Sequence, residues 1–240
     1  MWKNGKAVRA LTEIEEKHSP KVVKVLTVES YEDTLNNLEL NRPSGIEELF
    51  LSDESALREE YVLKYMLDVE TRGSASLLNM SAFSDPRKYT LRVKSPGTDE
   101  TVERNVDLLE TFNWLLGLRV QHVAVSETYS ADFSNKDKRT VAKLKSSQTG
   151  SYWFRQVSGT LPDGREALIV WRTLSDDAAQ DEAALLAWFE SKGHLLSESL
   201  DVIYTNGDCN LVASKPSSAR WSVESLEAHF HELMFEGSEG

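Results

Sequence analysis

The sequence predicts an α+β protein with a helix-rich first half, followed by a small mixed β-sheet unit with an antiparallel hairpin and one β-α-β crossover. Two observations lead to this fold class. Apolar residues recur with helical spacing up to about Leu118, and from Arg119 onward they alternate as in strands. We therefore expect an N-terminal linker over 1–20, a helix-rich subdomain over 21–118 and a mixed-sheet α/β subdomain over 119–240.

The first half begins with a predicted strand and two predicted helices. KVVKVLTVES (Lys21–Ser30) is rich in β-branched residues, which favours a strand, and SYEDTLNNLEL predicts a helix capped by Ser30. SDES, which begins at Ser52, has the capping and acidic residues of a helix start. The apolar face that follows extends this helix to about Val69.

A short strand and the most apolar helix complete the first half. An Asp-Pro turn leads into a strand predicted over Tyr89–Lys94, and SPGTDE after it predicts a loop. In NVDLLETFNWLLGL, Asp107 and Glu110 have the spacing of a capping box, and Gly117 stands where a helix ends. This helix is apolar on most sides, so we expect it to be buried at the centre of the protein.

The second half is predicted from strand alternation, one tight turn and two helix signals. RVQHVAVSETY alternates as a strand, and SYWFRQVSGT and REALIVWRTL flank LPDG, whose Asp-Gly pair predicts a hairpin. SDDAAQDEAALLAWFESKG predicts a helix and LDVIYTNGD another strand, which together with the preceding strand form a parallel crossover. SVESLEAHFHELMFEG predicts an amphipathic C-terminal helix, whose inner face carries Val223, Leu226, Phe230, Leu233 and Met234.

Composition limits the class of protein. Apolar residues make up 40% of the 240 residues, which is enough for a folded core. The single cysteine, Cys209, allows no disulfide framework, and the N-terminus has no secretory signal. No stretch reaches the ~18–20 apolar residues of a membrane helix. These features predict a cytoplasmic protein that does not associate with a membrane.

The net charge of −12 is unevenly distributed along the chain. Residues 175–240 carry 13 acidic and 3 basic side chains. Binding to phosphates needs clustered Lys and Arg, so this quarter is a poor candidate for contact with nucleic acid. We expect it to face solvent or a basic protein surface.

The motifs of common enzyme classes are missing from the sequence. It contains neither G-x-G-x-x-G nor G-x-x-x-x-G-K-[ST], and no G-x-S-x-G. His229 and His231 fall on different sides of a helix and cannot share a metal ion, and Cys209 alone cannot build a thiolate site. Glu166 has no lysine on its strand, which a nuclease site would need. We therefore predict no catalytic, cofactor-binding or metal-binding residue in this chain.

One polar turn offers an alternative, enzymatic interpretation. In YVLKYMLDVETRGSASLLN, the side chains of Asp68, Glu70 and Arg72 are close enough in sequence to form a small active site. On a continuous helix, however, Asp68 and Glu70 point to different sides, Arg72 forms an i, i+4 ion pair with Asp68, and Gly73 ends the helix. We favour this structural interpretation and keep the enzymatic one as the alternative.

The strongest candidate for a binding site is the basic segment KDKRTVAKLKSS, which we expect to form a loop between two strands. Its basic residues are Lys136, Lys138, Arg139, Lys143 and Lys145. Tyr152, Trp153 and Phe154 follow closely, and a basic loop beside aromatic residues can hold phosphates or single-stranded bases. The alternative is a solvated loop whose charge serves solubility.

Five long strings follow one another along the chain: VESYEDTLNNLEL, EEYVLKYMLDVETRGSASLLN, VDLLETFNWLLGLRV, ALIVWRTL and DVIYTNGDCNL. In this order and spacing they resemble the C-terminal region of site-specific adenine DNA methyltransferases, the modification (Mod) subunits of type III-like restriction–modification systems. The resemblance covers roughly residues 21–240. It implies an accessory or assembly region whose partners are the methyltransferase core or the restriction subunit, duplex DNA, or a second copy of the chain.

The catalytic motifs of that family are absent from this sequence. Its members carry D-P-P-Y and an F-x-G-x-G loop for S-adenosylmethionine, whereas the most similar segment here is SDPRKY (Ser84–Tyr89), which has no second proline. We therefore expect the chain to hold only the trailing part of such an enzyme, to bind no cofactor itself and to be inactive alone. The alternative function is a stand-alone DNA-binding module that uses residues 136–145.

Overall fold

The structure, a computed structural model, divides the chain into two compact units, Met1–Ser30 and Tyr31–Gly240. The residues that it describes are 24–39, 71, 73–79, 83–95, 97–98, 100–136, 139–192, 200–214 and 220–236. In the first unit, residues 24–30 form neither helix nor strand. The strand predicted over Lys21–Ser30 is therefore wrong for these residues, because β-branched side chains favour a strand only where a second backbone pairs with it.

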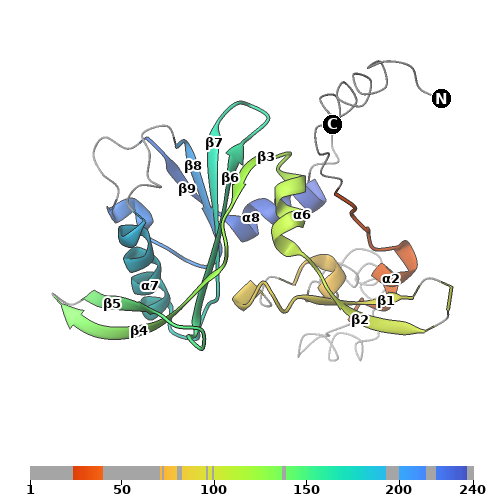
Figure 1. Cartoon of the computed structure of the whole chain (residues 1–240). Coiled ribbons are helices and arrows are strands. Elements are labelled where there is room, and N and C mark those ends of the chain that lie inside the picture. The colour runs from red at the N-terminus through yellow and green to blue at the C-terminus, as the bar shows by residue number, and fades with distance from the viewer. Residues whose placement is uncertain are drawn as a thin grey trace, which may run out of the picture. The chain divides into compact units, whose positions relative to one another are not determined.

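The second unit contains the helices and strands of the described chain (Figure 1). In chain order they are α2 (Tyr31–Asn36), the 3₁₀ turn η1 (Ala75–Leu77), β1 (Thr90–Lys94), β2 (Thr101–Asn105), α6 (Leu108–Leu115), β3 (Arg119–Val123), β4 (Glu127–Lys136), β5 (Arg139–Ser146), β6 (Tyr152–Thr160), β7 (Glu166–Arg172), α7 (Ala178–Ser191), β8 (Val202–Thr205), the 3₁₀ turn η4 (Leu211–Ser214), β9 (Ser222–Ser225), α8 (Leu226–His231) and the π-helix η5 (Glu232–Glu236). This composition confirms the α+β class. The helix predicted over Ser52–Val69 lies outside the described residues.

The larger sheet is mixed, as predicted. Its strands follow the order β5-β4-β6-β7-β8-β9, with β3 paired to β6. The β6–β7 pair is antiparallel and turns at Leu161–Arg165, where Gly164 adopts a positive φ of 89°. β8 runs parallel to β7 and is joined to it through α7, so the predicted β-α-β crossover is confirmed.

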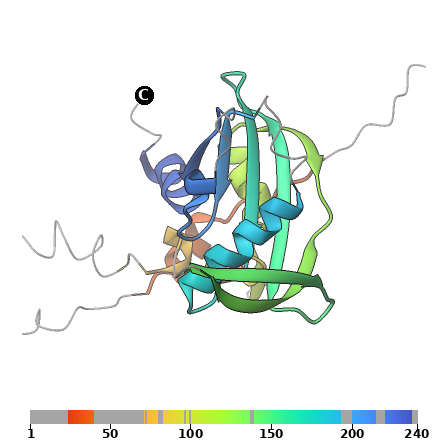
Figure 2. The ribbon, with the colours of Figure 1, turned by 90° about the vertical axis from the view of Figure 1, so that its left-hand side faces the viewer.

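Helices cover both faces of the larger sheet, and each face has its own apolar core. On one face, Phe112 of α6 and Phe230 of α8 pack with Trp171 of β7. On the other face, Trp188 of α7 stacks on Phe154 of β6 with ring centroids 5.2 Å apart. Figure 2 shows α7 in front of the strands and the β4–β5 hairpin crossing below it. Because both faces are covered, β7 is apolar without alternation.

The described part of the first half contains a two-stranded sheet beside its helices and is not mainly helical. β1 and β2 form a two-stranded antiparallel sheet, and the sequence pattern indicated only the first of these strands. α2 covers the outer edge of β1, where Asn37 Oδ1 accepts from Arg92 N at 2.9 Å and Asp33 Oδ1 accepts from Lys94 N at 2.8 Å. β2 escaped prediction because four of its five residues are exposed, which leaves no apolar alternation. The subdomain boundary at Leu118 stays a prediction.

α6 begins and ends as predicted, but it is not buried on most of its sides. The Asp107 carboxylate caps it by accepting from Glu110 N at 3.0 Å, and Gly117 has a positive φ of 62° just after its end. Leu108 and Phe112 are buried, whereas Trp114 is 64% exposed. The expectation of a helix buried on most sides is therefore wrong at Trp114.

The C-terminal helix begins later than predicted. Residues 222–225 form strand β9, which pairs in parallel with β8, and the Ser225 side chain caps α8. Leu226 and Phe230 are buried as expected, but Met234 is exposed. No helix within the described ranges is long and apolar enough to cross a membrane.

Candidate functional site

The basic segment folds into strand rather than loop. β4 and β5 pair antiparallel without a register shift, from Tyr129 opposite Ser146 to Lys136 opposite Arg139. The predicted loop is therefore wrong for Arg139–Ser146. Burial alternates along β5, because Thr140, Ala142 and Leu144 point inward between exposed residues. These three side chains are too small or too few for the sequence to predict a strand.

The two faces of the β4–β5 hairpin differ in character. Phe133 and Leu144 pack in the core beneath α7, and the Phe133 ring meets Tyr152 edge-on at 5.7 Å. Successive strand residues point to opposite faces, so the residues between them point away from α7. Four exposed cations share that outer face, and we call them the basic face: Lys136, Arg139, Lys143 and Lys145. Lys138 lies outside the described residues.

One carboxylate shares the basic face. Lys145 Nζ lies 2.6 Å from Asp132 Oδ2, and this hydrogen bond lowers the pKa of the Asp132 carboxyl. The charge of Lys143 acts on Asp132 in the same direction. Within the described ranges, no ion pair is recorded for Lys136, Arg139 or Lys143. The face therefore has a net positive charge and three cations that are available to a ligand.

The aromatic residues that follow the basic segment are not available to bases. Tyr152, Trp153 and Phe154 are all buried, each with less than a tenth of its surface exposed. Phe154 is covered by Trp188 of α7, and the Trp153 ring is covered by the Arg87 guanidinium at 5.1 Å. Because these rings are buried, single-stranded bases cannot stack on them, whereas contact with phosphates needs only the cations.

The SDPRKY segment forms a turn stabilised by ion pairs. Arg87 Nε donates to Asp85 Oδ1 at 2.7 Å, Arg87 Nη2 donates to Asp85 Oδ2 at 2.8 Å, and Lys88 Nζ lies 3.2 Å from Asp85 Oδ2. The hydrogen bond from Arg87 holds the pKa of Asp85 at about 2, well below its ordinary value. The carboxylate is thus bound to two cations of its own turn, which is a different arrangement from a catalytic Asp-Pro-Pro turn.

The other residues considered for catalysis that the structure describes have structural contacts. Asp68, Glu70 and Arg72 lie outside the described residues. Glu166 accepts a hydrogen bond from Thr160 at 3.0 Å at the start of β7. His229 packs on Tyr204 and approaches Glu232, whereas His231 packs on Phe235. In the described part of the chain, no three His, Cys, Asp or Glu side chains are arranged to hold a metal ion.

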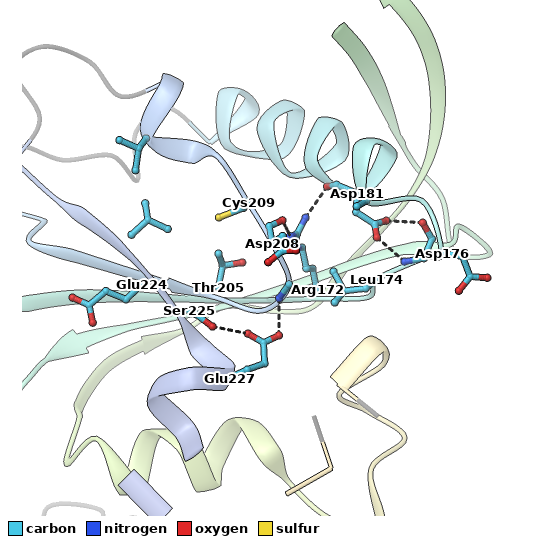
Figure 3. A pocket seen from close by; sticks show the side chains of 15 residues that line it. Arg172, Leu174, Asp176, Asp181, Thr205, Asp208, Cys209, Glu224, Ser225 and Glu227 are labelled. Carbon is cyan, nitrogen blue, oxygen red and sulfur yellow. Dashed lines mark hydrogen bonds between the residues drawn. The ribbon is translucent and has the colours of Figure 1, made fainter. Parts of the chain in front are cut away.

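A cavity lies at the carboxyl ends of β7, β8 and β9. The sequence patterns did not predict it. Its volume is about 570 Å³, and Figure 3 shows the side chains that line it. At its inner end, Arg172 donates to the main-chain carbonyls of Asn206 at 2.9 Å, Asp181 at 2.7 Å and Asp208 at 2.9 Å. The Asn-Gly turn after β8 and the acidic start of α7 are the sequence features that mark this end of the strands, where ligands bind in many α/β sheets, but neither feature by itself predicts a cavity.

The cavity is acidic, and several of its polar groups bond to the protein itself. Asp181 accepts from Ser175 N at 2.7 Å, and Glu227 accepts from Gly207 N at 2.6 Å. Burial lowers the pKa of Arg172 and raises the pKa of the Cys209 thiol. With Asp176, Asp208 and Glu224 also around the cavity, its negative charge repels phosphate. The basic face is therefore the better candidate for contact with nucleic acid.

The chain matches no protein-family model, and neither a curated protein nor a solved structure is significantly similar to it. The resemblance to adenine DNA methyltransferases therefore stays a prediction.

Proposed function

We propose that this chain is a non-catalytic accessory region of an adenine-specific DNA methyltransferase of a restriction–modification system. Its role is to hold the backbone of duplex DNA on the basic face while another polypeptide segment transfers the methyl group. The observation that carries the proposal is the separation of the two hairpin faces. One face is packed beneath α7, and the other presents four cations to solvent. Such an enzyme works in the cytoplasm, in contact with the chromosome.

The sequence supports an assisting role rather than a catalytic one. A base-flipping methyltransferase needs a pocket for the extruded adenine and a site for the methyl donor. The motifs that build these sites in the resembling family, D-P-P-Y and F-x-G-x-G, do not occur in this sequence. The segment most similar to the first, SDPRKY, uses its aspartate to bind Arg87 and Lys88.

Basic and acidic residues are concentrated in different parts of the chain, which favours a different partner for each part. The basic face lies on β4 and β5, whereas residues 175–240 carry 13 acidic and 3 basic side chains. The cations on β4 and β5 suit contact with DNA, and the acidic residues of 175–240 suit contact with a basic protein surface. A methyltransferase core or a restriction subunit is the partner that the proposal assigns to the acidic segment.

Co-purification with a catalytic core tests the assembly part of the proposal. The chain is mixed with a core that carries D-P-P-Y and F-x-G-x-G from the same genome, and the mixture is separated by size-exclusion chromatography with light scattering. We expect a stable complex at low salt that weakens as salt rises, since charged surfaces are screened. Two separate peaks at every salt concentration would contradict the assembly role.

A stand-alone DNA-binding module is the second candidate function. It is favoured by one observation, that all four cations of the basic face come from a single hairpin of this chain. The two functions differ in the effect of the core. A stand-alone module binds duplex DNA equally well with and without the core, whereas an accessory region binds more tightly when the core engages the same duplex.

A further inference from the structure

The SDPRKY turn (Ser84–Tyr89) is distant in sequence from the β4–β5 hairpin but is connected to its outer face through Trp153 of β6. Ser130 stands opposite Lys145 on the outer face of the hairpin, and Thr128, two residues earlier in β4, points to the same side. Thr128 is paired with Trp153 of β6, whose ring lies beneath the Arg87 guanidinium. The outer face of the hairpin thus continues, residue by residue, to Arg87.

Arg87 is held in a fixed orientation at this position. Two of its N–H groups donate to Asp85, and its planar group covers the Trp153 ring at 5.1 Å. The Asp85 hydrogen bond raises the pKa of Arg87, which is charged at every physiological pH. A guanidinium bonded along one edge keeps donors on its other edge, so it can bind a phosphate without losing its partner.

Lys88 adds a second cation to the same turn. Its side chain is 80% exposed and lies 3.2 Å from Asp85. Asp85 compensates one of the two positive charges, so the turn carries a net charge of +1. The turn therefore strengthens the positive potential at the Lys145 end of the hairpin, where Asp132 weakens it.

We propose that the SDPRKY turn is a second phosphate-binding element, in which Asp85 and Trp153 position Arg87, and that it extends the basic face into one continuous track for the backbone of duplex DNA. This inference rests on the proposed function, because it assigns the same ligand to a longer surface. From Lys136 to Thr128 the track follows β4 for eight residues, roughly 26 Å at the rise of a strand. Arg87 and Lys88 lie beyond that end.

The geometry favours a duplex over other anionic ligands. The cations are spread along a strand and do not converge on a pocket, which suits a stiff and evenly charged rod. The aromatic rings that a single strand would use, Tyr152, Trp153 and Phe154, are buried. A flexible acidic peptide has no comparable reason to follow the full length of the track.

The matched control is Arg165, which stands at the opposite end of β6. Like Arg87, it pairs with the aspartate two residues before it, with Nε 2.6 Å from Asp163 Oδ2, and it is about equally exposed. It lies on the turn between β6 and β7, about 23 Å along the strand from Trp153. R165A therefore removes the same charge from the same kind of ion pair, away from the track.

The experiment measures duplex binding by fluorescence anisotropy, with labelled DNA of about two helical turns. Salt is varied between about 50 and 200 mM. We expect R87A and K88A each to weaken binding by about eightfold at 0.1 M salt and to reduce the slope of log K against log salt by about 0.9, the value for one lost phosphate contact. R165A should change neither quantity, and R87K should recover only part of the loss.

The outcomes separate this inference from the proposed function. If K136A/R139A/K143A binds like the wild type, the proposed function fails and the inference fails with it. If that triple variant binds weakly while R87A and K88A behave like R165A, only the inference fails. K88A decides the matter if R87A does not fold, because Lys88 is mostly exposed. Tighter binding to a single strand, or full competition by polyglutamate, would also overturn the duplex assignment.

Discussion

Arginine side chains have three different roles in this protein, and the role follows from what each guanidinium contacts. Arg172 is buried and bonded to three main-chain carbonyls. Arg87 is half-exposed, bonded to Asp85 and packed on Trp153. Arg139 is exposed on the outer face of the hairpin. We expect substitutions to affect stability at the first position, and DNA affinity at the second and third.

The buried arginine gives a prediction for stability. Replacing Arg172 with Met leaves three carbonyl groups without their donor, and we expect the free energy of unfolding to fall by about 3 kcal/mol. Urea denaturation followed by tryptophan fluorescence measures this change. R165A, on an exposed turn, should stay within about 0.5 kcal/mol of the wild type. An R172M protein as stable as R165A would show that the Arg172 hydrogen bonds do not stabilise the fold.

The Asp85 carboxylate gives a prediction for pH dependence. Its pKa is lowered in the folded protein to about 2 from an ordinary 3.8, mainly by the hydrogen bond from Arg87. A lowered pKa means that the stabilisation is present above the ordinary value and disappears as pH falls toward 2. D85N should therefore be less stable than the wild type at pH 6, and the difference should shrink between pH 4 and about 2. A difference independent of pH in thermal melts would contradict this assignment.

At the scale of elements, sequence reasoning succeeded where local signals were strong. The β6–β7 hairpin was predictable from its Asp-Gly turn, α6 from the Asp107 cap and Gly117, and the crossover from the order of strand, helix and strand. It failed for β2, β5 and β9, which are short or mostly exposed strands. Strands of this kind are stabilised by pairing with neighbours far along the chain, and a local pattern carries no trace of that pairing.

The candidate site was predictable in composition but not in geometry. The charged residues of 136–145 were recognisable from the sequence, and most of them share one face of a hairpin. The neighbourhood of Arg87 and the hairpin was not recognisable, because it depends on the pairing of β4 with β6 and on the packing of Arg87 against Trp153. The aromatic residues misled the sequence argument, since burial removes them from any ligand.

The connection that leads from the hairpin into β6 gives a prediction for an element. A Cβ atom on Gly150 would stand 2.1 Å from the Tyr129 carbonyl oxygen, so alanine cannot fit unless β4 moves. We expect G150A to lower the free energy of unfolding by about 2 kcal/mol and to weaken duplex binding, because the basic face shifts with β4. S151A, at the neighbouring exposed position, serves as the control in thermal melts and in anisotropy. G150A with wild-type values in both would show that the hairpin is not anchored at this contact.

At the scale of the whole molecule, the sheet of Tyr31–Gly240 joins surfaces of opposite charge. The basic face lies at the β5 edge of the sheet, and the acidic cavity lies at the carboxyl ends of β7, β8 and β9. Lysine on an edge strand also discourages unwanted pairing with other sheets. Protection of the edge strand does not require the cations to bind DNA. A functional measurement therefore has to distinguish DNA binding from edge protection.

Methyl transfer in the presence of a catalytic core makes that separation most directly. Methyl transfer from S-adenosylmethionine to duplex DNA is measured for the core alone, for the core with the wild-type chain and for the core with K136A/R139A/K143A. The wild-type chain is also assayed without the core. We predict that the wild-type chain raises the rate at subsaturating DNA, and that the triple variant, although folded and bound to the core, raises it much less because the added DNA contact is lost. Equal rates in all three reactions, or methyl transfer by the chain without the core, would contradict the account.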